Sequence, residues 1–523
     1  MLAVSLGGAN MPRAAHAAVP RWEPSELTFT STTAHGNPFL VRFEATAAGP
    51  VGERLRLPGF YDGDRTWRLR FAPPAPGRWQ IRTSSDDPQL DGQTRTVEAE
   101  AKPRPGVHGG LRVDPEHPHH FVFEDGTRYF LMGYECDWLW ALDLGEDELR
   151  TLEPFLDKLA ASGFNHVLMN AYAHDTAWCP GHSQPGDLGP PVLFAWEGTN
   201  ERPDHTRFGL AYWQHYDRVI RAMHERGLIA HLMIKVYNKL VDWPAPGSPE
   251  DDLYFRWLVA RYAAFPNVVW DFSKEGHNEP DAEYKLSRFR LLRQSDPYRR
   301  LITEHDDDDL YDRGVYDGLL DFRTDQQHGN WHETILAQRR RHRWPVLNAE
   351  FGYEHGPRGL EDRTYGVVQP PEEVARRAWE IAMGGGYPAY YYTYTAWDVI
   401  RPGDTPPGYA YFRHLRDFFA RVGYWALEPA DEVVNRGYCL ARPGEEYVVY
   451  LEAAGPVTLQ LAGAAGSLAA EWFSPLTGER RAAPDVRDGA VTLEPPPDWQ
   501  DRPVALHVGR PPDSAAAERR VRP

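Results

Sequence analysis

The sequence predicts an α/β protein in which a (β/α)8 barrel is flanked by an N-terminal and a C-terminal β-sandwich domain. The chain has 523 residues, which at roughly 150 residues per domain suggests about three domains. The middle of the chain alternates short apolar segments with long amphipathic ones. Both flanks consist of short segments in which apolar and polar residues alternate, with turn residues between them. Together these patterns indicate a large barrel between two antiparallel β domains.

The first part of the chain combines a short extension with a predicted sandwich. Residues 1–20 partly resemble a signal segment, but their apolar run is short and lacks a basic start. Met11 is an alternative start, so a cytoplasmic and a secreted location both stay open. Residues 21–105 contain alternating segments such as 67–71 and 79–83, which predict an immunoglobulin-like β-sandwich.

Residues 107–425 contain eight candidate strands separated by helical segments. Apolar residues recur every three or four positions in 149–159, 212–223 and 374–381, as expected for helices that pack on a sheet. The candidate strands are 129–133, 166–170, 229–234, 268–272, 301–304, 320–323, 345–349 and 389–393. Eight such units predict a (β/α)8 barrel. A doubly wound open sheet is the alternative, but no GxGxxG or phosphate-binding loop follows the first strand.

The last part of the chain returns to short strands. Residues 427–510 are punctuated by glycine and proline and predict a second β-sandwich, and the polar residues 511–523 predict a disordered tail. The chain has 57 basic and 75 acidic residues, a formal net charge of −18. This charge repels phosphate backbones and anionic membranes, and no run of eighteen apolar residues is present. We therefore expect no nucleic-acid and no membrane partner.

The cysteines do not predict a structural role in cross-linking. Cys136, Cys179 and Cys439 are odd in number, far apart and without metal-binding spacing. Neither a disulfide framework nor a structural zinc site is predicted. We expect Cys136 to be a buried thiol, because no motif for a cysteine nucleophile accompanies it.

Polar and aromatic side chains follow the candidate strands, and the carboxyl ends of barrel strands are where such folds bind ligands. Carboxylate, imidazole, amide and indole groups that converge on one rim suit a neutral ligand rich in hydroxyl groups, so a carbohydrate is the expected partner. The residues expected to contact substrate are, in order, Tyr134, Asp137, Trp138, Asn170, Tyr172, His174, Lys235, Tyr237, Lys274, His277, Glu304, His305, Gln327, His328, Tyr394 and Trp397.

Glu275 and Glu350 are the expected catalytic pair. They follow the fourth and seventh candidate strands, which face each other across the mouth of a barrel. Retaining glycoside hydrolysis needs one carboxylic acid and one carboxylate about 5 to 5.5 Å apart. Lys274 and His277 would tune the acidity of Glu275, and Tyr394 or His305 would keep Glu350 ionised.

Two motifs carry a resemblance to a known family. The run Asn267–Glu275 resembles the fourth-strand signature of clan A glycoside hydrolases, and Pro345–Glu354 is similar to the seventh-strand nucleophile motif of apiosidase-like glycosidases. Residues 22–92 and 447–478 resemble the N-terminal module and the so-called collagen-binding module that flank such barrels. The resemblance implies a retaining O-glycoside hydrolase that acts on plant or microbial oligo- or polysaccharides without a cofactor.

The sequence also departs from that pattern. Lys274 stands where clan A enzymes usually have asparagine, and a second glutamate, Glu279, follows four positions after Glu275. Either glutamate could be the acid, although the strand register favours Glu275. Apiosidase-like enzymes often carry aspartate at this first position, so the sugar that is bound stays open, as do exo or endo cleavage and assembly into homo-oligomers.

Two other functions compete with hydrolysis by a glutamate pair. The first is a non-catalytic carbohydrate-binding or adhesion protein on a degenerate barrel, which Lys274 favours. The second is a metal-dependent hydrolase, suggested by the acidic run 304–309 beside nearby histidines. A run of like charges is more often an exposed loop, so we expect no metal site.

Overall fold

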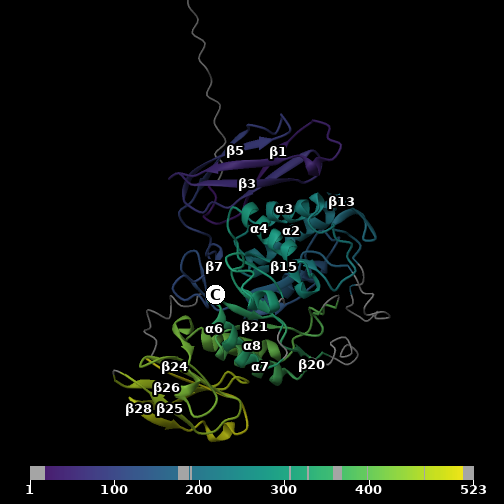
Figure 1. Ribbon diagram of the computed structural model, residues 1–523. Coiled ribbons are helices and arrows are strands. Elements are labelled where there is room, and N and C mark those ends of the chain that lie inside the picture. Colours follow the sequence, from purple (N-terminus) through teal and green to yellow (C-terminus); the bar gives the residue numbers. More distant parts are fainter. Residues whose placement is uncertain are drawn as a thin grey trace, which may run out of the picture.

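The central feature of the molecule is a parallel β-barrel (Figure 1). The computed structural model describes residues 18–174, 188, 191–305, 308–326, 329–356, 368–396, 399–464 and 466–510. Within these residues, eight parallel strands are ordered β16-β15-β14-β11-β10-β21-β18-β17, and a bridge between His305 and Thr324 joins the two ends. The strands are β10 (Gly133–Glu135), β11 (His166–Asn170), β14 (Ile229–Val236), β15 (Val268–Lys274), β16 (Ile302–Thr303), β17 (Arg323–Asp325), β18 (Val346–Asn348) and β21 (Tyr387–Tyr390). The predicted fold class is confirmed.

The first barrel strand differs from the prediction. The segment 129–133 was expected to form it, but β9 (Arg128–Tyr129) pairs antiparallel with β8 (Phe121–Phe123), which in turn pairs with β7 (Leu111–Val113). Phe121, Tyr129 and Leu131 share one buried core with residues of the barrel interior such as Leu168 and Met233. The apolar run is therefore needed to cover one end of the barrel, and the first barrel strand starts later, at Gly133.

Helices cover the outside of the barrel. Ser248 caps α3 by accepting a hydrogen bond from the Asp251 amide, and Pro249 occupies the first turn. The three amphipathic segments expected from the sequence correspond to α1, α2 and α7. In the described part of the chain, no helix has the length and apolar character needed to cross a membrane. The helices are α1 (Leu152–Ala161), α2 (Leu210–Glu225), α3 (Pro249–Tyr262), α4 (Ala282–Ser295), α5 (Asp308–Asp312), α6 (Trp331–Arg341), α7 (Pro371–Met383) and α8 (Gly408–Phe419).

Short elements connect the barrel units. Two pairs of strands lie outside the barrel, and single 3-10 turns follow several strands. They are β12 (Trp196–Thr199), β13 (Arg202–Phe208), β19 (Tyr353–Glu354), β20 (Val368–Gln369), η1 (Pro38–Leu40), η2 (Leu139–Ala141), η3 (Gly276–Asn278), η5 (Tyr424–Ala426), η6 (Asp431–Val433) and η7 (Pro497–Trp499). Of these, η3 matters most for the site, because it begins directly after Glu275.

The N-terminal domain is an antiparallel β structure that lies next to α2, α3 and α4 (purple in Figure 1). Its order is β1-β4-β3-β2-β5-β6, and β3 pairs with β2 through its first half and with β4 through its second half. Alternating residues such as Trp67, Leu69 and Ile81 are buried, as the period-two pattern predicts. The strands are β1 (Ser25–Thr30), β2 (Phe43–Ala48), β3 (Arg54–Tyr61), β4 (Thr66–Phe71), β5 (Gly77–Ser85) and β6 (Thr94–Ala99).

The C-terminal domain consists of two antiparallel sheets beside α6, α7 and α8 (yellow in Figure 1). One face of the larger sheet covers the smaller sheet, and the other face packs on the barrel helices, where Tyr450 stacks on Trp379 with ring centroids 5.2 Å apart. The larger sheet is β22 (Glu428–Pro429), β23 (Tyr438–Arg442), β24 (Glu446–Leu451), β29 (Val504–Gly509), β26 (Leu468–Phe473) and β27 (Arg480–Val486); the smaller is β25 (Val457–Leu461) and β28 (Gly489–Leu493).

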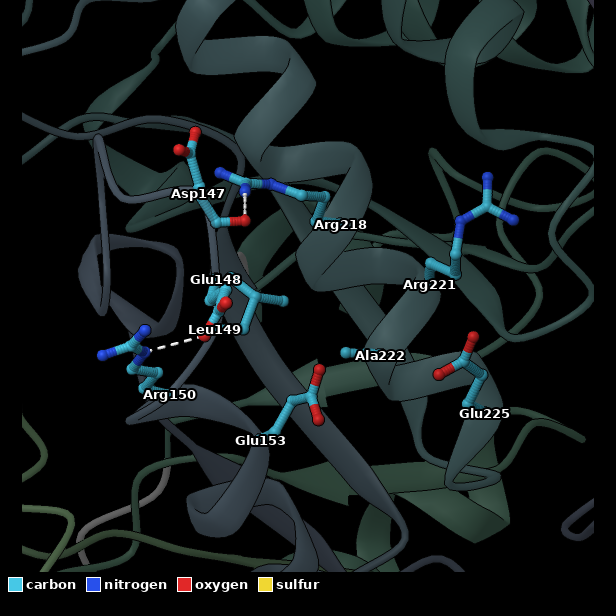
Figure 2. A pocket seen from close by; sticks show the side chains of 9 residues that line it. All are labelled: Asp147, Glu148, Leu149, Arg150, Glu153, Arg218, Arg221, Ala222 and Glu225. Carbon is cyan, nitrogen blue, oxygen red and sulfur yellow. Dashed lines mark hydrogen bonds and ion pairs between the residues drawn. The ribbon is translucent and has the colours of Figure 1, made fainter.

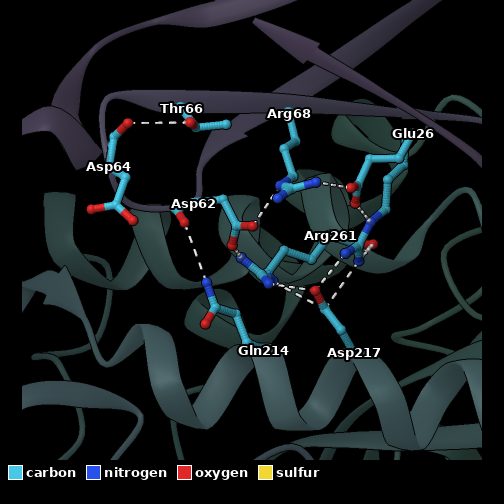
Figure 3. Close-up of polar contacts among 9 residues, drawn as sticks. Glu26, Asp62, Asp64, Thr66, Arg68, Gln214, Asp217 and Arg261 are labelled. Carbon is cyan, nitrogen blue, oxygen red and sulfur yellow. Dashed lines mark hydrogen bonds and ion pairs between the residues drawn. The ribbon is translucent and has the colours of Figure 1, made fainter. Parts of the chain in front are cut away.

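A network of charges fixes the N-terminal domain to the barrel (Figure 3). Asp217 of α2 accepts hydrogen bonds from Arg70 of β4 (3.0 Å) and from Arg261 of α3 (3.1 Å), and Arg261 also pairs with Asp62 at 3.0 Å. Burial would raise the pKa of Asp217, but the charges of Arg261 and Arg70 lower it to about 2. The domain is thus held by a buried anion between two cations.

We predict that Asp217→Asn destabilises the whole protein. The change removes the carboxylate that two buried guanidinium groups share, so that Arg261 keeps only Asp62 and Arg70 keeps only Glu26 as an anionic partner. Removing one partner of a buried ion pair costs about 3 kcal/mol. The measurement is the apparent melting temperature at a fixed scan rate. Glu148→Gln is the control, because Glu148 and its partner Arg150 are 69% and 80% exposed and such pairs contribute little. Equal melting temperatures for the two variants would contradict the prediction.

Candidate active site

Lys274 is the centre of the site. It is the last residue of β15, and its side chain is 1% exposed. Its Nζ atom lies 2.5 Å from Oε1 of Glu350, forms an ion pair with Glu135, and lies 3.3 Å from Oδ1 of Asp137. Burial would lower the pKa of Lys274, but the charges of Asp137, Glu135 and Glu350 raise it well above its usual value. A buried cation at the end of the fourth barrel strand therefore joins carboxyl groups that end or follow the first and seventh barrel strands.

Glu350 is surrounded by hydrogen-bond donors. Tyr353 donates its hydroxyl to Oε2, Gln326 donates to the same oxygen at 3.3 Å, and Lys274 donates to Oε1. Nε2 of His305 lies 3.6 Å from Oε1. Donors on both oxygens favour the ionised form of a carboxyl group. The residue, which is 2% exposed, is thus held in one orientation by donors on both of its oxygens.

Glu275 has a different environment, although it follows Lys274 directly. Its backbone is left-handed, with φ 59° and ψ 44°, and the adjacent Gly276 amide donates to the carbonyl of His305 at 3.0 Å. Burial raises the pKa of Glu275, and the nearby charge of Glu350 raises it further. Its side chain keeps 15% exposure and lies 3.5 Å from His277. This carboxyl group therefore holds its proton more tightly than an ordinary glutamate does.

Several other predicted residues meet at this mouth of the barrel. Asp137 accepts a hydrogen bond from Tyr391, and Glu304 pairs with Lys285 at 3.0 Å. Asn170 is fully buried, and no partner for its amide atoms is found among the described residues. The ring nitrogens of His305 also lack a hydrogen bond there, and burial lowers the pKa of this imidazole well below its usual value. Buried polar groups are normally hydrogen-bonded, so these groups are suited to a ligand.

Two predicted contact residues face the helices instead. Tyr134 shares hydrogen bonds with the hydroxyls of Thr395 (2.9 Å) and Tyr409 (2.8 Å), because side chains alternate along a strand and its neighbour Glu135 takes the interior position. Lys235 pairs with Asp251 of α3 at 2.7 Å. The polar atoms of Tyr134 and Lys235 are therefore engaged by residues outside the carboxyl cluster.

The predicted aromatic residues lie mostly in packed layers. Trp138 is fully buried and stacks on Trp140 with centroids 5.4 Å apart. Tyr172 packs among aromatic rings of the second and third barrel units, Tyr237 packs near Phe272, His174 lies near Phe194, and Arg401 lies 3.6 Å over the ring of Tyr394. Trp397, Gln327 and His328 lie outside the described residues.

Sequence reasoning missed Glu135, Tyr353, Gln326 and Tyr391. Because the first strand was placed too early, Glu135 was assigned to the following loop, where a charge needs no explanation. The signal in the sequence was the alternation of side chains along a strand. Once the strand begins at Gly133, Glu135 takes an inward position and its neighbours Tyr134 and Cys136 take outward ones. Tyr353 lies three residues after Glu350, but nothing in the sequence shows that the chain turns its hydroxyl back onto that carboxylate.

Three residues of the cluster have the geometry of metal ligands. One ligand atom each of Glu135, His305 and Glu350 lies within 4.8 Å of the others. The ammonium group of Lys274, however, already contacts both carboxyl groups and supplies the positive charge between them. The donor set is therefore complete as a charge cluster, and we assign no metal to it.

A surface pocket of about 480 Å³ lies elsewhere, between the segment before α1 and helix α2 (Figure 2). Arg218 donates to the carbonyl of Asp147, and Arg150 pairs with Glu148 at 2.7 Å. None of the predicted site residues lines this pocket.

The comparisons with known proteins agree with this architecture. The model of the family described as apiosidase-like, catalytic domain, matches residues 116–436, which is more than half of the chain. A domain of unknown function named DUF5060 matches residues 18–86. No curated protein gives a significant match.

Solved structures with a similar fold include two proteins from Bacteroides vulgatus. A candidate glycoside hydrolase has 21% identity and a TM-score of 0.77, with 94% of this chain and 99% of that chain covered. A glycoside hydrolase family 5 protein has 18% identity and a TM-score of 0.61, with 79% and 94% covered. Another structure, described as a glycoside hydrolase, has 17% identity and a TM-score of 0.59, with 78% and 98% covered. At these identities, the likeness concerns the fold.

A second buried glutamate lies just beyond the cluster. Glu354 of β19 accepts hydrogen bonds from the Tyr390 hydroxyl (2.7 Å) and the Gly408 amide (2.9 Å), both at Oε2. Burial raises its pKa to about 7 in spite of these donors. The folded protein therefore holds a proton here in a pH range where the unfolded chain has lost it.

We predict that Glu354→Gln becomes increasingly stabilising, relative to the unchanged protein, as pH rises from 5 to 8. The folded-state pKa of about 7 lies above the unfolded value of 4.5, so this contribution to stability is complete below pH 4.5 and is lost as pH rises through 7. The full difference in the free energy of unfolding between the variant and the unchanged protein is about 3 kcal/mol. Glutamine keeps an oxygen for both donors and stays neutral. The measurement is the melting temperature of the variant and of the unchanged protein at pH 5 and at pH 8, with the surface variant Glu153→Gln as the control. A melting-temperature difference between Glu354→Gln and the unchanged protein that is the same at both pH values would contradict the prediction.

Proposed function

The chain belongs to the apiosidase-like family and is a glycoside hydrolase with a carbohydrate substrate, and from this premise we propose that it cleaves O-glycosidic bonds with retention of configuration. In this proposal Glu350 is the nucleophile and Glu275 is the general acid and base. The substrates are oligo- or polysaccharides of plant or microbial origin.

The observation that carries the proposal is the contrast between two neighbouring carboxyl groups. Lys274 and Tyr353 donate hydrogen bonds to the two oxygens of Glu350, whereas burial and the charge of Glu350 raise the pKa of Glu275. A retaining mechanism needs this pair: an anion that attacks and an acid that protonates. Two carboxyl groups in equal environments would not divide these roles.

The reaction follows from these protonation states. Glu275 transfers its proton to the glycosidic oxygen while Glu350 attacks the anomeric carbon, so the bond to the leaving oxygen breaks and a covalent glycosyl-enzyme forms. Glu275, now ionised, takes a proton from water, and the resulting hydroxyl attacks the anomeric carbon and releases Glu350 as a carboxylate. The proton returned to Glu275 restores the starting state.

The choice of Glu275 over Glu279 has structural support. Glu275 follows β15 directly and lies close enough to Glu350 for their charges to interact. Glu279 lies beyond η3, where its carboxyl group accepts the Asp281 amide at 3.0 Å. It therefore serves the start of α4.

Lys274 bears on the non-catalytic alternative. If a degenerate barrel only bound glycans, a lysine in place of asparagine would mark the loss of a sugar contact. Here its ammonium group contacts Glu350 itself, so the substitution supplies the nucleophile with a cation. This arrangement favours the hydrolase over the binding protein.

We predict that Glu350→Gln and Glu275→Gln each lower turnover by about 1,000-fold or more, because one removes the nucleophile and the other the proton donor. Glu279→Gln, the matched control on the same loop, keeps most of the activity. The assay is release of 4-nitrophenol from a panel of aryl glycosides, together with reducing ends from plant and bacterial polysaccharides. Loss of activity in Glu279→Gln with activity kept in Glu275→Gln would reverse the assignment, and full activity of Glu350→Gln would end the proposal.

Azide separates the two roles. In Glu275→Ala the glycosyl-enzyme still forms from an aryl glycoside with a good leaving group, so azide should restore turnover and give a glycosyl azide of retained configuration. In Glu350→Ala azide takes the place of the nucleophile and gives the inverted product. The anomeric configuration of the azide product is read by NMR, and inversion in Glu275→Ala would contradict the assigned roles.

We predict that Lys274→Met shifts the acidic limb of the pH profile of kcat/KM to higher pH by about one unit or more. Lys274 is the cation at the centre of the carboxyl cluster, so its removal makes negative charge in the cluster less stable, and the active form of the enzyme then requires a higher pH. Lys274→Arg is the control, because it keeps the positive charge, and its limb should move less. An acidic limb that stays in place in Lys274→Met would show that the lysine does not hold the nucleophile ionised.

A further inference from the structure

A chain of buried polar side chains crosses the barrel interior beneath the carboxyl cluster. Nε2 of His166 (β11) lies 2.9 Å from Nδ1 of His231 (β14), and Nε2 of His231 lies 2.8 Å from Oδ2 of Asp271 (β15). The Tyr129 hydroxyl lies 3.3 Å from the remaining nitrogen of His166. His166, His231 and Asp271 are each 0% exposed. The proposed reaction of Glu275 and Glu350 does not use these groups. Burial of polar side chains costs free energy, so their presence in the barrel interior needs an explanation.

Asp271 ends this chain with two hydrogen bonds to backbone. Its Oδ1 atom accepts the amide of His305 at 3.0 Å and the amide of Ser273 at 3.1 Å. Together with His231 on the other oxygen, three groups contact one carboxyl group. If Asp271 is ionised, His231 donates its Nε2 proton to Asp271, and its Nδ1 atom accepts the Nε2 proton of His166. Both imidazoles are then protonated at Nε2, and both donate in the direction of Asp271.

His305 connects Asp271 to both proposed catalytic residues. Its amide is held by Asp271, its carbonyl accepts the Gly276 amide at 3.0 Å, and its ring lies 3.6 Å from Glu350. The amide of Gly276 follows Glu275, whose left-handed backbone is an unfavourable conformation for a glutamate. An unfavourable backbone persists only where its neighbours fix it, and here the His305 carbonyl does so together with the Asn278 amide, which donates to the Glu275 carbonyl at 3.0 Å.

We infer that Asp271 is a positioning residue for the hydrolysis: oriented by His231, it fixes the backbone of Ser273 and His305 and thereby the placement of Glu275 and Glu350. This inference rests on the proposed function, because it assigns Asp271 a role in that reaction. Asp271 itself contacts neither glutamate in the described structure, so its effect passes through the strand ends.

The chain offers a matched control for the test. Asp296 is also buried, and it accepts the amides of Tyr298 (2.7 Å) and Arg300 (2.9 Å) and the indole N–H of Trp270 (2.9 Å). It has the same pattern of one ring donor and two backbone donors, but it follows α4 and precedes β16, at the end of the barrel away from the site. Asp296→Asn therefore removes the same kind of contact without touching the turn at Glu275.

The experiment compares Asp271→Asn with Asp296→Asn. Asparagine has one oxygen and no charge, so it either turns its NH2 group toward the two backbone amides or faces the N–H of His231 with it. Either arrangement weakens the hold on the turn, and we expect kcat to fall about 100-fold with KM nearly unchanged, because small misplacements of reacting groups have effects of this size. Asp296→Asn should keep its kcat while losing stability. The probe is the 4-nitrophenyl glycoside that the unchanged enzyme hydrolyses fastest. Equal kcat values for the two variants would overturn the inference.

Crystal structures of the same variants give a result that needs no substrate. We expect residues 273–276 and 305 to shift in Asp271→Asn and to superimpose on the unchanged protein in Asp296→Asn. An unshifted turn in Asp271→Asn overturns the inference even if the Glu350 variant confirms the proposed function. Conversely, full activity of Glu350→Gln refutes the proposed function whatever the turn does.

A second pair of variants covers the case in which Asp271→Asn does not fold. His231→Leu removes the donor that orients Asp271 and should lower kcat about tenfold, whereas His231→Gln restores an N–H near the carboxyl group and should recover most of that loss. Recovery in the glutamine variant supports a positioning role. Equal kcat values for the two His231 variants would indicate that the histidine only fills space, and would overturn the inference.

Discussion

One buried ammonium group, that of Lys274, determines how the mouth of the barrel can be built. Glu135, Asp137 and Glu350 surround it at almost zero exposure, and Glu275 lies beside it. A single positive charge cannot balance four carboxylates in a site that is largely buried. Burial raises the pKa of Glu135, and burial together with the charge of Glu350 raises the pKa of Glu275, so both groups hold a proton more tightly than an ordinary glutamate does. In the proposed mechanism, the division of roles between an acid and a nucleophile thus follows from the number of charges that the site can hold.

The flanking domains bear on this arrangement from the outside. The N-terminal sheet is joined to α2 and α3 through Arg70, Asp217 and Arg261, and the C-terminal sheet packs its aromatic face on α7 and α8. Both contacts fix helices that cover barrel strands (Figure 1). The flanking domains therefore pack directly on the barrel that carries the site residues, unlike modules that are joined to a barrel only by flexible linkers.

The sequence could predict the repeating pattern of strands and helices, but it could not predict the position at which each strand begins or the way in which each loop folds back. Eight apolar segments with helices between them indicate a barrel, and two glutamates at the ends of the fourth and seventh strands stand out within that frame. The first strand was misplaced because 129–133 is apolar for another reason: it covers one end of the barrel. That shift concealed Glu135 and placed Tyr134 on the wrong face. The contacts of Tyr353 and Gln326 with Glu350 depend on how loops fold back, which no periodicity records.

The site concentrates several features that oppose folding, and the rest of the molecule offsets them. The left-handed backbone of Glu275, and the polar atoms of Asn170 and His305 that find no hydrogen bond among the described residues, each cost about 1–3 kcal/mol. Around them lie closely packed aromatic residues such as Trp138, Trp140 and Tyr172, which contribute burial without competing for the polar groups. In a sequence, aromatic residues at the strand ends suggest sugar binding, but in this structure Trp138, Trp140 and Tyr172 are buried and pack on one another. A rim rich in tryptophan therefore indicates where such a site is, and less reliably which side chains touch its ligand.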